Sequence, residues 1–144
     1  MIILDLNEIY TELIMEHNMS KRNRRELESC DVCKKGHNPS CGDEIEIKLK
    51  YNGDIIEDIA FTGKGCAISQ ASTSMMIDLV KGKSKNEAKD LVKTFIAMIK
   101  REIKDEEELE VLEDAMVLQN ISNMPARVKC AVLAWHTLEE MMKK

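Results

Sequence analysis

The chain has 144 residues, of which 44% are hydrophobic and 33% are charged, and its formal net charge at pH 7 is -5. This size and composition predict a single domain over residues 1–144 with a buried core. The acidic balance argues against nucleic acid as a partner, because nucleic-acid binders neutralise phosphates with a basic face. No apolar run approaches the ~18 residues that a membrane helix needs, and the apolar start is too short for a secretion signal. We therefore expect a cytoplasmic protein with no membrane partner.

The chain contains five cysteines. A reducing compartment disfavours structural disulfides, and an odd number of cysteines cannot pair completely within one chain. Metal binding or thiol chemistry is therefore the favoured use of these residues.

The first third of the chain predicts a helix, a basic connection and a loop. Apolar residues recur at helical spacing over residues 6–17, which indicates an amphipathic helix. The basic run at residues 21–25 is either a solvated connection or a docking patch for an acidic partner. Residues 30–43 are rich in Gly, Pro, Asn, Ser and Cys, a composition typical of a loop.

The middle of the chain predicts an antiparallel sheet. Apolar and charged residues alternate over residues 45–51, and Asn52-Gly53 is a strong hairpin signal before a returning strand over residues 54–61. Two strands alone are marginally stable, so we expect a third strand just before the loop that carries Cys41.

The rest of the chain predicts helices. After a tight turn at residues 62–65, a helix runs over residues 66–80, and a capping box at residues 84–87 opens a helix to about residue 101. The acidic run at residues 105–110 is a linker or the first turn of a helix, and a short helix follows over residues 111–118. Pro125 lies near the start of the last helix. The order of one helix, a sheet and a run of helices predicts an α+β fold.

Three cysteines lie at similar structural positions. Cys41 is in a loop that leads into a strand, Cys66 follows two glycines at a helix start, and Cys130 is in the first turns of the last helix. Helix N-termini carry partial positive charge, which stabilises a thiolate. Asp43 lies two residues after Cys41, so a turn can direct both side chains to one centre. Thiolates and a carboxylate together suit zinc or ferrous iron.

A second arrangement competes for the same thiol. Cys30, Cys33, His37 and Cys41 have the spacing C-x2-C-x3-H-x3-C, which is typical of a compact zinc knuckle. Spacing alone does not decide which site includes Cys41. Cys30 and Cys33 are otherwise a redox pair or simply surface thiols.

Three segments carry a resemblance to a known family. They are NPSCGD at residues 38–43, GKGCAISQAS at residues 63–72 and PARVKCAVLAW at residues 125–135. In this order they resemble the SufU branch of the SufU/IscU/NifU N-terminal family. The resemblance covers nearly the whole chain and implies a small antiparallel three-stranded sheet covered by helices on one side.

The resemblance also implies a site and a reaction. It places a metal or a nascent cluster on Cys41, Asp43, Cys66 and Cys130. In the SufU branch this metal is zinc, and the position of Cys41 accepts persulfide sulfur from a PLP-dependent, SufS-like cysteine desulfurase. A downstream cluster scaffold or a reductant then takes the sulfur. Arg127, on the same predicted helix as Cys130, either steadies anionic sulfur or is a surface arginine.

The other branch of the family implies an alternative function. Its members are scaffolds that assemble a transient [2Fe-2S] cluster from iron and sulfur on the same cysteines and transfer it to apo-proteins. They have a histidine before the third cysteine, where this chain has Lys129, and a Leu-Pro-Pro-Val-Lys stretch that residues 124–129 lack. These departures favour zinc-dependent sulfur transfer. A third interpretation is a plain zinc-stabilised interaction domain.

Overall fold

The structure, a computed structural model, describes residues 6–103 and 105–143. The elements in chain order are α1 (Leu6–Ser20), β1 (Val32–Asn38), β2 (Asp43–Asn52), β3 (Ile55–Lys64), α2 (Ala67–Val80), α3 (Lys85–Ile99), α4 (Glu106–Leu109), the 3-10 helix η1 (Glu110–Asn123) and α5 (Pro125–Met141). The three strands form one antiparallel sheet in the order β1-β2-β3, which confirms the predicted α+β fold with a third strand. None of the described helices is long and apolar enough to cross a membrane.

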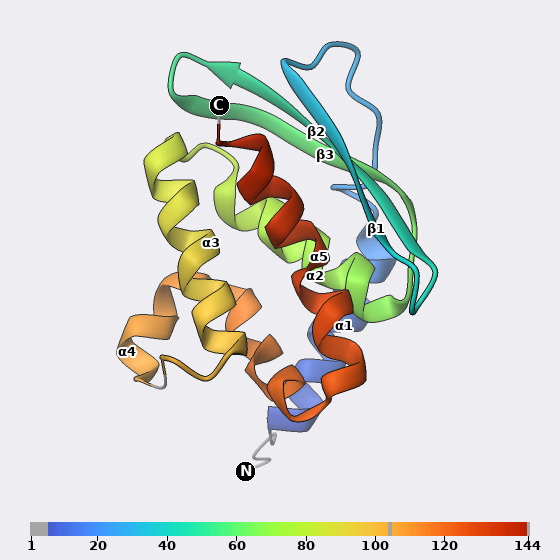
Figure 1. Cartoon of the computed structure of the whole chain (residues 1–144), viewed down its shortest axis with the longest axis vertical. Helices are drawn as coiled ribbons and strands as arrows, with labels where there is room; N and C mark the ends of the chain where they lie inside the picture. The colour runs from blue at the N-terminus through green and yellow to red at the C-terminus, as the bar shows by residue number, and fades with distance from the viewer. Residues whose placement is uncertain (1–5, 104, 144) are drawn as a thin grey trace.

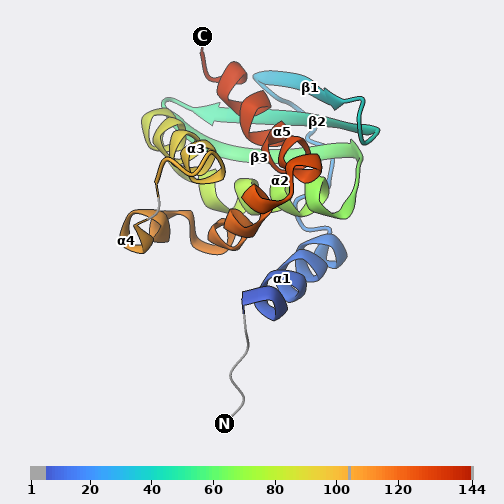
Figure 2. The ribbon, with the colours of Figure 1, turned by 60° about the horizontal axis from the view of Figure 1, so that its bottom comes forward.

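The helices lie on one face of the sheet, as Figures 1 and 2 show. The alternation along β2 explains this arrangement, because Ile45, Ile47 and Leu49 are buried between more exposed charged residues. Across the helical layer, the rings of Phe95 and Trp135 stack with centroids 3.9 Å apart. Trp135 of the last helix is therefore part of the core.

The third strand lies inside the segment that was predicted to be a loop. Strand β1 occupies half of residues 30–43, so the loop prediction is wrong there. Gly36 contributed to the loop prediction, but it is a strand residue. Its backbone packs against α5, because a Cβ there would lie 2.4 Å from Thr137 Oγ1. Only residues 39–42 form the turn between β1 and β2.

Strand β3 continues into the predicted turn at residues 62–65. Gly63 pairs with Ile45 and has a φ of +114°. A Cβ at Gly63 would lie 2.2 Å from the carbonyl oxygen of Glu44, so only glycine lets the two strands approach this closely. The strand therefore continues to Lys64 and ends just before the start of α2.

Capping signals in the sequence account for the starts of α3 and α4. Ser84 accepts a hydrogen bond from the N–H of Glu87, which confirms Ser84 as the N-cap of α3. Asp105 caps the short helix α4, so the acidic run is a helix start. The predicted helix at 111–118 lies within η1, a 3-10 helix interrupted by non-helical backbone at Glu113.

The basic run after α1 is used inside the chain. Arg22 pairs with Asp78, and Arg25 pairs with Asp58. Arg24 donates to the Gln70 side chain and to a backbone carbonyl of β3. These contacts favour a structural role for the run over a docking patch, because they join the connection after α1 to β3 and α2.

Candidate metal centre

Cys41 and Asp43 are positioned by the turn that joins β1 to β2. The backbone N–H of Cys41 donates to the carbonyl of Asn38 at 3.3 Å. Gly42 follows with a φ of +71°, a conformation that favours glycine. Asp43 begins β2 and is fully buried, whereas Cys41 is partly exposed. The turn therefore presents an accessible thiol next to a buried carboxylate.

Cys66 is the N-cap residue of α2. Its Sγ accepts a 3.4 Å hydrogen bond from the N–H of Ser69, one turn into the helix. Its own N–H donates to Asp43 Oδ1 at 2.8 Å, which joins the start of α2 to the start of β2. The positive end of the helix dipole lies at this sulfur.

Cys130 enters the site from α5. It is 1% exposed, and its Sγ lies 3.0 Å from the Sγ of Cys41. Burial raises the pKa of the Cys130 thiol far above its usual range, and hydrogen bonds with Cys41, Asp43 and Cys66 raise it further. All four side chains expected from the resemblance therefore lie near one another.

Three of these four residues meet closely enough to bind one ion. The ligand atoms of Cys41, Asp43 and Cys130 lie within 4.8 Å of one another. No other group of three such side chains meets in this way among the side chains that the structure describes. Cys66 lies outside the tight group, with its thiol directed to the N–H of Ser69, but it interacts with Cys130.

The donor set fits a thiophilic divalent metal. Two thiols and a carboxylate converge, and a third thiol lies beside them, which matches the sulfur and oxygen ligands of zinc or iron. The Oδ1 of Asp43 is held by the Cys66 N–H, and its Oδ2 accepts a 3.3 Å hydrogen bond from Asn38. Such outer contacts orient a ligating carboxylate.

Asn38 is the residue that sequence reasoning missed. It is 5% exposed, and its Nδ2 lies 3.3 Å from Asp43 Oδ2 and 3.7 Å from Cys130 Sγ. In the sequence it was only a loop signal before Pro39. The register of the β1–β2 hairpin, in which Asn38 pairs with Asp43, would have placed it at the site.

Arg127 lies in the first turn of α5 and interacts with the thiols. Its side chain is exposed, and its pKa is raised by the charge of Cys66 first and then by a hydrogen bond to Cys130. The guanidinium group is therefore close enough to interact with anionic sulfur.

The competing zinc knuckle is not assembled. His37 and Cys33 lie exposed on β1, four residues apart on the same face, which separates them by about 13 Å along a strand. Cys30 lies before the start of β1, and the turn with Cys41 lies beyond its end. The structure thus places Cys41 with Cys130 and leaves the other three outside that group.

Comparisons with known proteins agree with this geometry. The sequence model of the NifU-like N-terminal domain family matches residues 9–144. The zinc-dependent sulfurtransferase SufU of Bacillus subtilis is 40% identical over 140 residues, which cover 97% of this chain and 93% of that protein. The iron-sulfur cluster assembly scaffold protein IscU of Thermotoga maritima is 40% identical over 136 residues, which cover 94% of each protein.

A solved structure has the same fold. It is described as an iron-sulfur cluster assembly scaffold protein for the SUF system, FiSufU, from Fervidobacterium islandicum AW-1. It superposes with a TM-score of 0.87 at 40% identity and covers 94% of this chain and 97% of its own. Sequence and fold therefore match over nearly the whole length. The protein belongs to the NifU-like N-terminal domain family, the group that its three motifs resemble.

Proposed function

We propose that the protein is a zinc-dependent sulfurtransferase of iron–sulfur cluster assembly, with Cys41 as the persulfide acceptor. The observation that carries this proposal is the meeting of Cys41, Asp43 and Cys130 within 4.8 Å, where Cys41 is the more exposed of the two thiols. An acceptor must reach a partner, while the other ligands remain in place. The B. subtilis relative, 40% identical, is named a zinc-dependent sulfurtransferase.

The residues that would hold zinc are Cys41, Asp43, Cys66 and Cys130. When bound, zinc keeps thiolates deprotonated near neutral pH. Asp43 is the fixed member of the set, because both of its oxygens are hydrogen bonded within the chain. Cys130 is held in place because it lies among the buried residues of α5.

The transfer step is a nucleophilic substitution at sulfur. The Cys41 thiolate attacks the outer sulfur of a persulfide that the partner presents. A bond forms between this sulfur and Cys41 Sγ, the partner's sulfur–sulfur bond breaks, and the partner's cysteine leaves as a thiolate. The product is a persulfide on Cys41, and no net oxidation occurs. Gly42 next to the acceptor permits backbone rotation during this movement.

Arg127 assists the anionic sulfur in this proposal. Its guanidinium already interacts with Cys66 and Cys130, and it carries a permanent positive charge. We expect it to hold the persulfide anion near the site.

The partner that supplies the sulfur is a PLP-dependent cysteine desulfurase of the SufS type. A downstream cluster scaffold takes the sulfur from Cys41. The five free cysteines suit a reducing compartment such as the cytoplasm.

Desulfurase turnover tests the proposal. Wild-type protein should stimulate turnover of cysteine by a SufS-type enzyme, and Cys41→Ala should abolish the stimulation. Cys33→Ala is the matched control, because it removes an accessible thiol of β1 that lies away from the centre and should leave the stimulation unchanged. Undiminished stimulation by Cys41→Ala would exclude Cys41 as the acceptor.

A second candidate function is a scaffold that builds a [2Fe-2S] cluster on the same ligands. The relative from T. maritima, also 40% identical, is named an iron-sulfur cluster assembly scaffold protein. Metal content separates the two functions. Colourless protein with one tightly bound zinc favours sulfur transfer, whereas anaerobic reconstitution of a stable, transferable cluster favours the scaffold.

A further inference from the structure

Cys30 and Cys33 lie at the end of β1 that is farther from the candidate metal centre. Cys33 pairs with Lys48 in the sheet register, whereas Asn38 pairs with Asp43 at the centre. Five residues of strand separate Cys33 from Asn38, a distance of about 16 Å. Both thiols are exposed. The two thiols are therefore a separate feature that the proposed sulfur transfer does not use.

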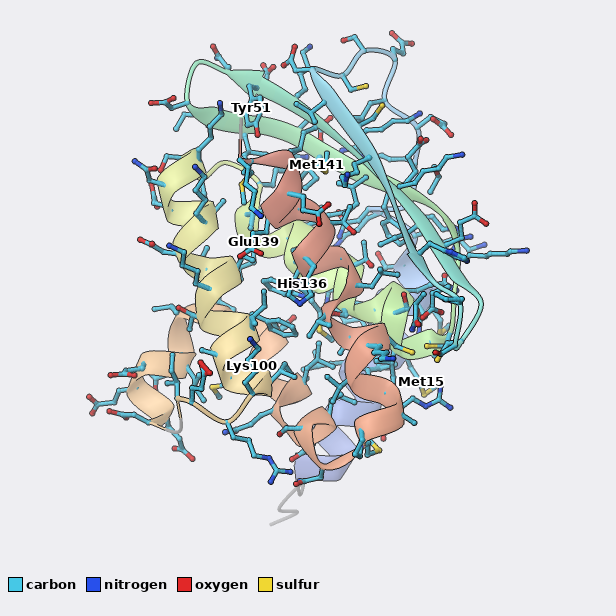
Figure 3. All side chains as sticks on the ribbon, in the orientation of Figure 1. Met15, Tyr51, Lys100, His136, Glu139 and Met141 are labelled. Atoms are coloured by element: carbon cyan, nitrogen blue, oxygen red, sulfur yellow. The ribbon has the colours of Figure 1, made fainter. Side chains whose placement is uncertain are left out.

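The chain between the two cysteines is fixed to the sheet. It bends at Asp31, whose N–H donates to the carbonyl of Leu49 at 2.7 Å. The Oδ2 of Asp31 accepts a 2.7 Å hydrogen bond from the N–H of Tyr51, which Figure 3 labels at this end of the sheet. A bend held by both backbone and side chain keeps the flanking cysteines together.

The two thiols lie close enough to influence each other. Loss of hydration raises the pKa of Cys30, the neighbouring Cys33 raises it further, and the cation of Lys48 lowers it. Lys48, which also pairs with Glu26 and Glu46, is a cation that favours the thiolate form of Cys30.

A metal site is not the best use of this pair. Tetrahedral zinc takes four ligands, and even an open zinc site keeps three from the protein. Within the described part of the chain, no third Cys, His, Asp or Glu joins these thiols in a group of the kind found around Cys41. Two exposed thiols on a fixed bend, without further ligands, are suited instead to reversible sulfur–sulfur bond formation.

We propose that Cys30 and Cys33 are a redox-active dithiol that exchanges with small-molecule disulfides and closes to an intramolecular disulfide. One of the two cysteines, as a thiolate, attacks one sulfur of the small disulfide, forms a mixed disulfide and releases one thiolate. The other cysteine then loses its proton, attacks the Sγ of the first and displaces the second thiolate. The dithiol is oxidised by two electrons, and the small disulfide is reduced to two thiols, so the exchange is balanced. A dithiol reductant reverses it.

Peptide mapping after exposure to oxidised glutathione tests the proposal. Cleavage after Lys and Arg places Cys30 and Cys33 together in the peptide of residues 26–34. Cys41, Cys66 and Cys130 fall in separate peptides, so reactions at the metal centre are read independently. Protein treated with oxidised glutathione is alkylated, digested without reductant and analysed by mass spectrometry.

We expect the wild-type peptide of residues 26–34 to lose two hydrogen atoms and to carry neither glutathione nor alkyl groups. Cys30→Ser and Cys33→Ser remove one thiol each, so the remaining cysteine should retain glutathione as a mixed disulfide or stay alkylated. Two glutathiones on the wild-type peptide, or a peptide that stays fully alkylated, would overturn the proposal. The result does not depend on sulfur transfer at Cys41.

Two lysine variants test the effect of the Lys48 charge on the Cys30 thiol. Lys48→Gln removes the cation next to Cys30 and should slow disulfide closure several-fold. Lys50→Gln is the matched control, since Lys50 follows on the same strand and pairs with Glu57. Equal rates for the two variants would overturn the role of Lys48.

Discussion

Gly65 sets how closely the start of α2 can approach Asp43. A Cβ at this position would lie 2.9 Å from Asp43 Oδ1 and 3.2 Å from Ser69 Oγ. The 2.9 Å distance to Asp43 Oδ1 is shorter than real Cβ contacts, so either the carboxylate or the start of α2 must move. The carboxylate is the more consequential of the two, because its Oδ1 accepts the N–H of Cys66.

The variant Gly65→Ala is expected to weaken zinc binding by about 10- to 100-fold, the range found when a contact that orients a ligand is lost. The methyl group displaces Asp43 Oδ1, which disturbs a carboxylate on which the proposed site depends. Competition of the purified protein with a zinc indicator dye measures the change in dissociation constant.

Gly53→Ala is the matched control for that experiment. Gly53 has a φ of +63° in the hairpin turn, and nothing lies within 4 Å of a Cβ added there. Alanine should cost about 1 kcal/mol of stability through backbone strain and leave zinc affinity unchanged. Equal zinc affinity in Gly65→Ala and wild type would show that Gly65 does not position the carboxylate.

At the residue scale, local signals in the sequence point to the three thiols and to Asp43 but not to Asn38, and spacing alone leaves Cys41 between two possible sites. Cys41, Cys66 and Cys130 stand out because glycine turns and helix starts are local signals. Asn38 does not, because its contact with Cys130 joins elements far apart in the chain and its contact with Asp43 depends on the register of the β1–β2 hairpin. A buried polar contact of this kind is fixed by tertiary packing, which a single sequence does not display.

At the scale of elements, the packing of β1 on α5 brings the turn with Cys41 to the helix with Cys130. The contact depends on Gly36, where a Cβ would lie 2.4 Å from Thr137 Oγ1 and 3.2 Å from Leu133 Cδ1. The same glycine made the segment resemble a loop in composition. Local propensity was therefore overruled by a close approach between two elements.

Gly36→Ala is expected to destabilise the fold by about 1–3 kcal/mol, the usual cost of extra volume in a packed interior. The added methyl group forces β1 away from α5. Urea unfolding followed by the fluorescence of Trp135, which is buried in the helical layer, measures the change in free energy of unfolding.

A second-site variant tests the mechanism of that effect. Thr137→Ala removes the hydroxyl that the new Cβ would meet, so Gly36→Ala combined with Thr137→Ala should lose less stability than the two single changes summed. Additive free energies would mean that the strand and helix do not conflict at this point.

At the scale of the whole molecule, the candidate centre is where three distant segments meet. The β1–β2 turn brings Cys41 and Asp43, the start of α2 brings Cys66, and α5 brings Cys130. In Figure 1 these segments lie in different colours along the chain and converge at one end of the sheet. A metal bound there would join them, so metal binding and global stability should be coupled.

Removal of zinc with a chelator is therefore expected to lower the melting temperature. A ligand present at 100 times its dissociation constant stabilises the folded state by about 2.7 kcal/mol, which corresponds to about 5–10 °C for a domain of this size.

The Cys30→Ala/Cys33→Ala double variant should lose the same number of degrees as wild type, because these thiols lie about 16 Å from the centre along β1. Cys130→Ala should have a low melting temperature before chelation, and the chelator should change that temperature little, because the site of this variant is already incomplete. Differential scanning calorimetry with and without chelator makes the comparison. A double variant that no longer responds to the chelator would mean that the Cys30–Cys33 pair, rather than the centre at Cys130, holds the stabilising metal.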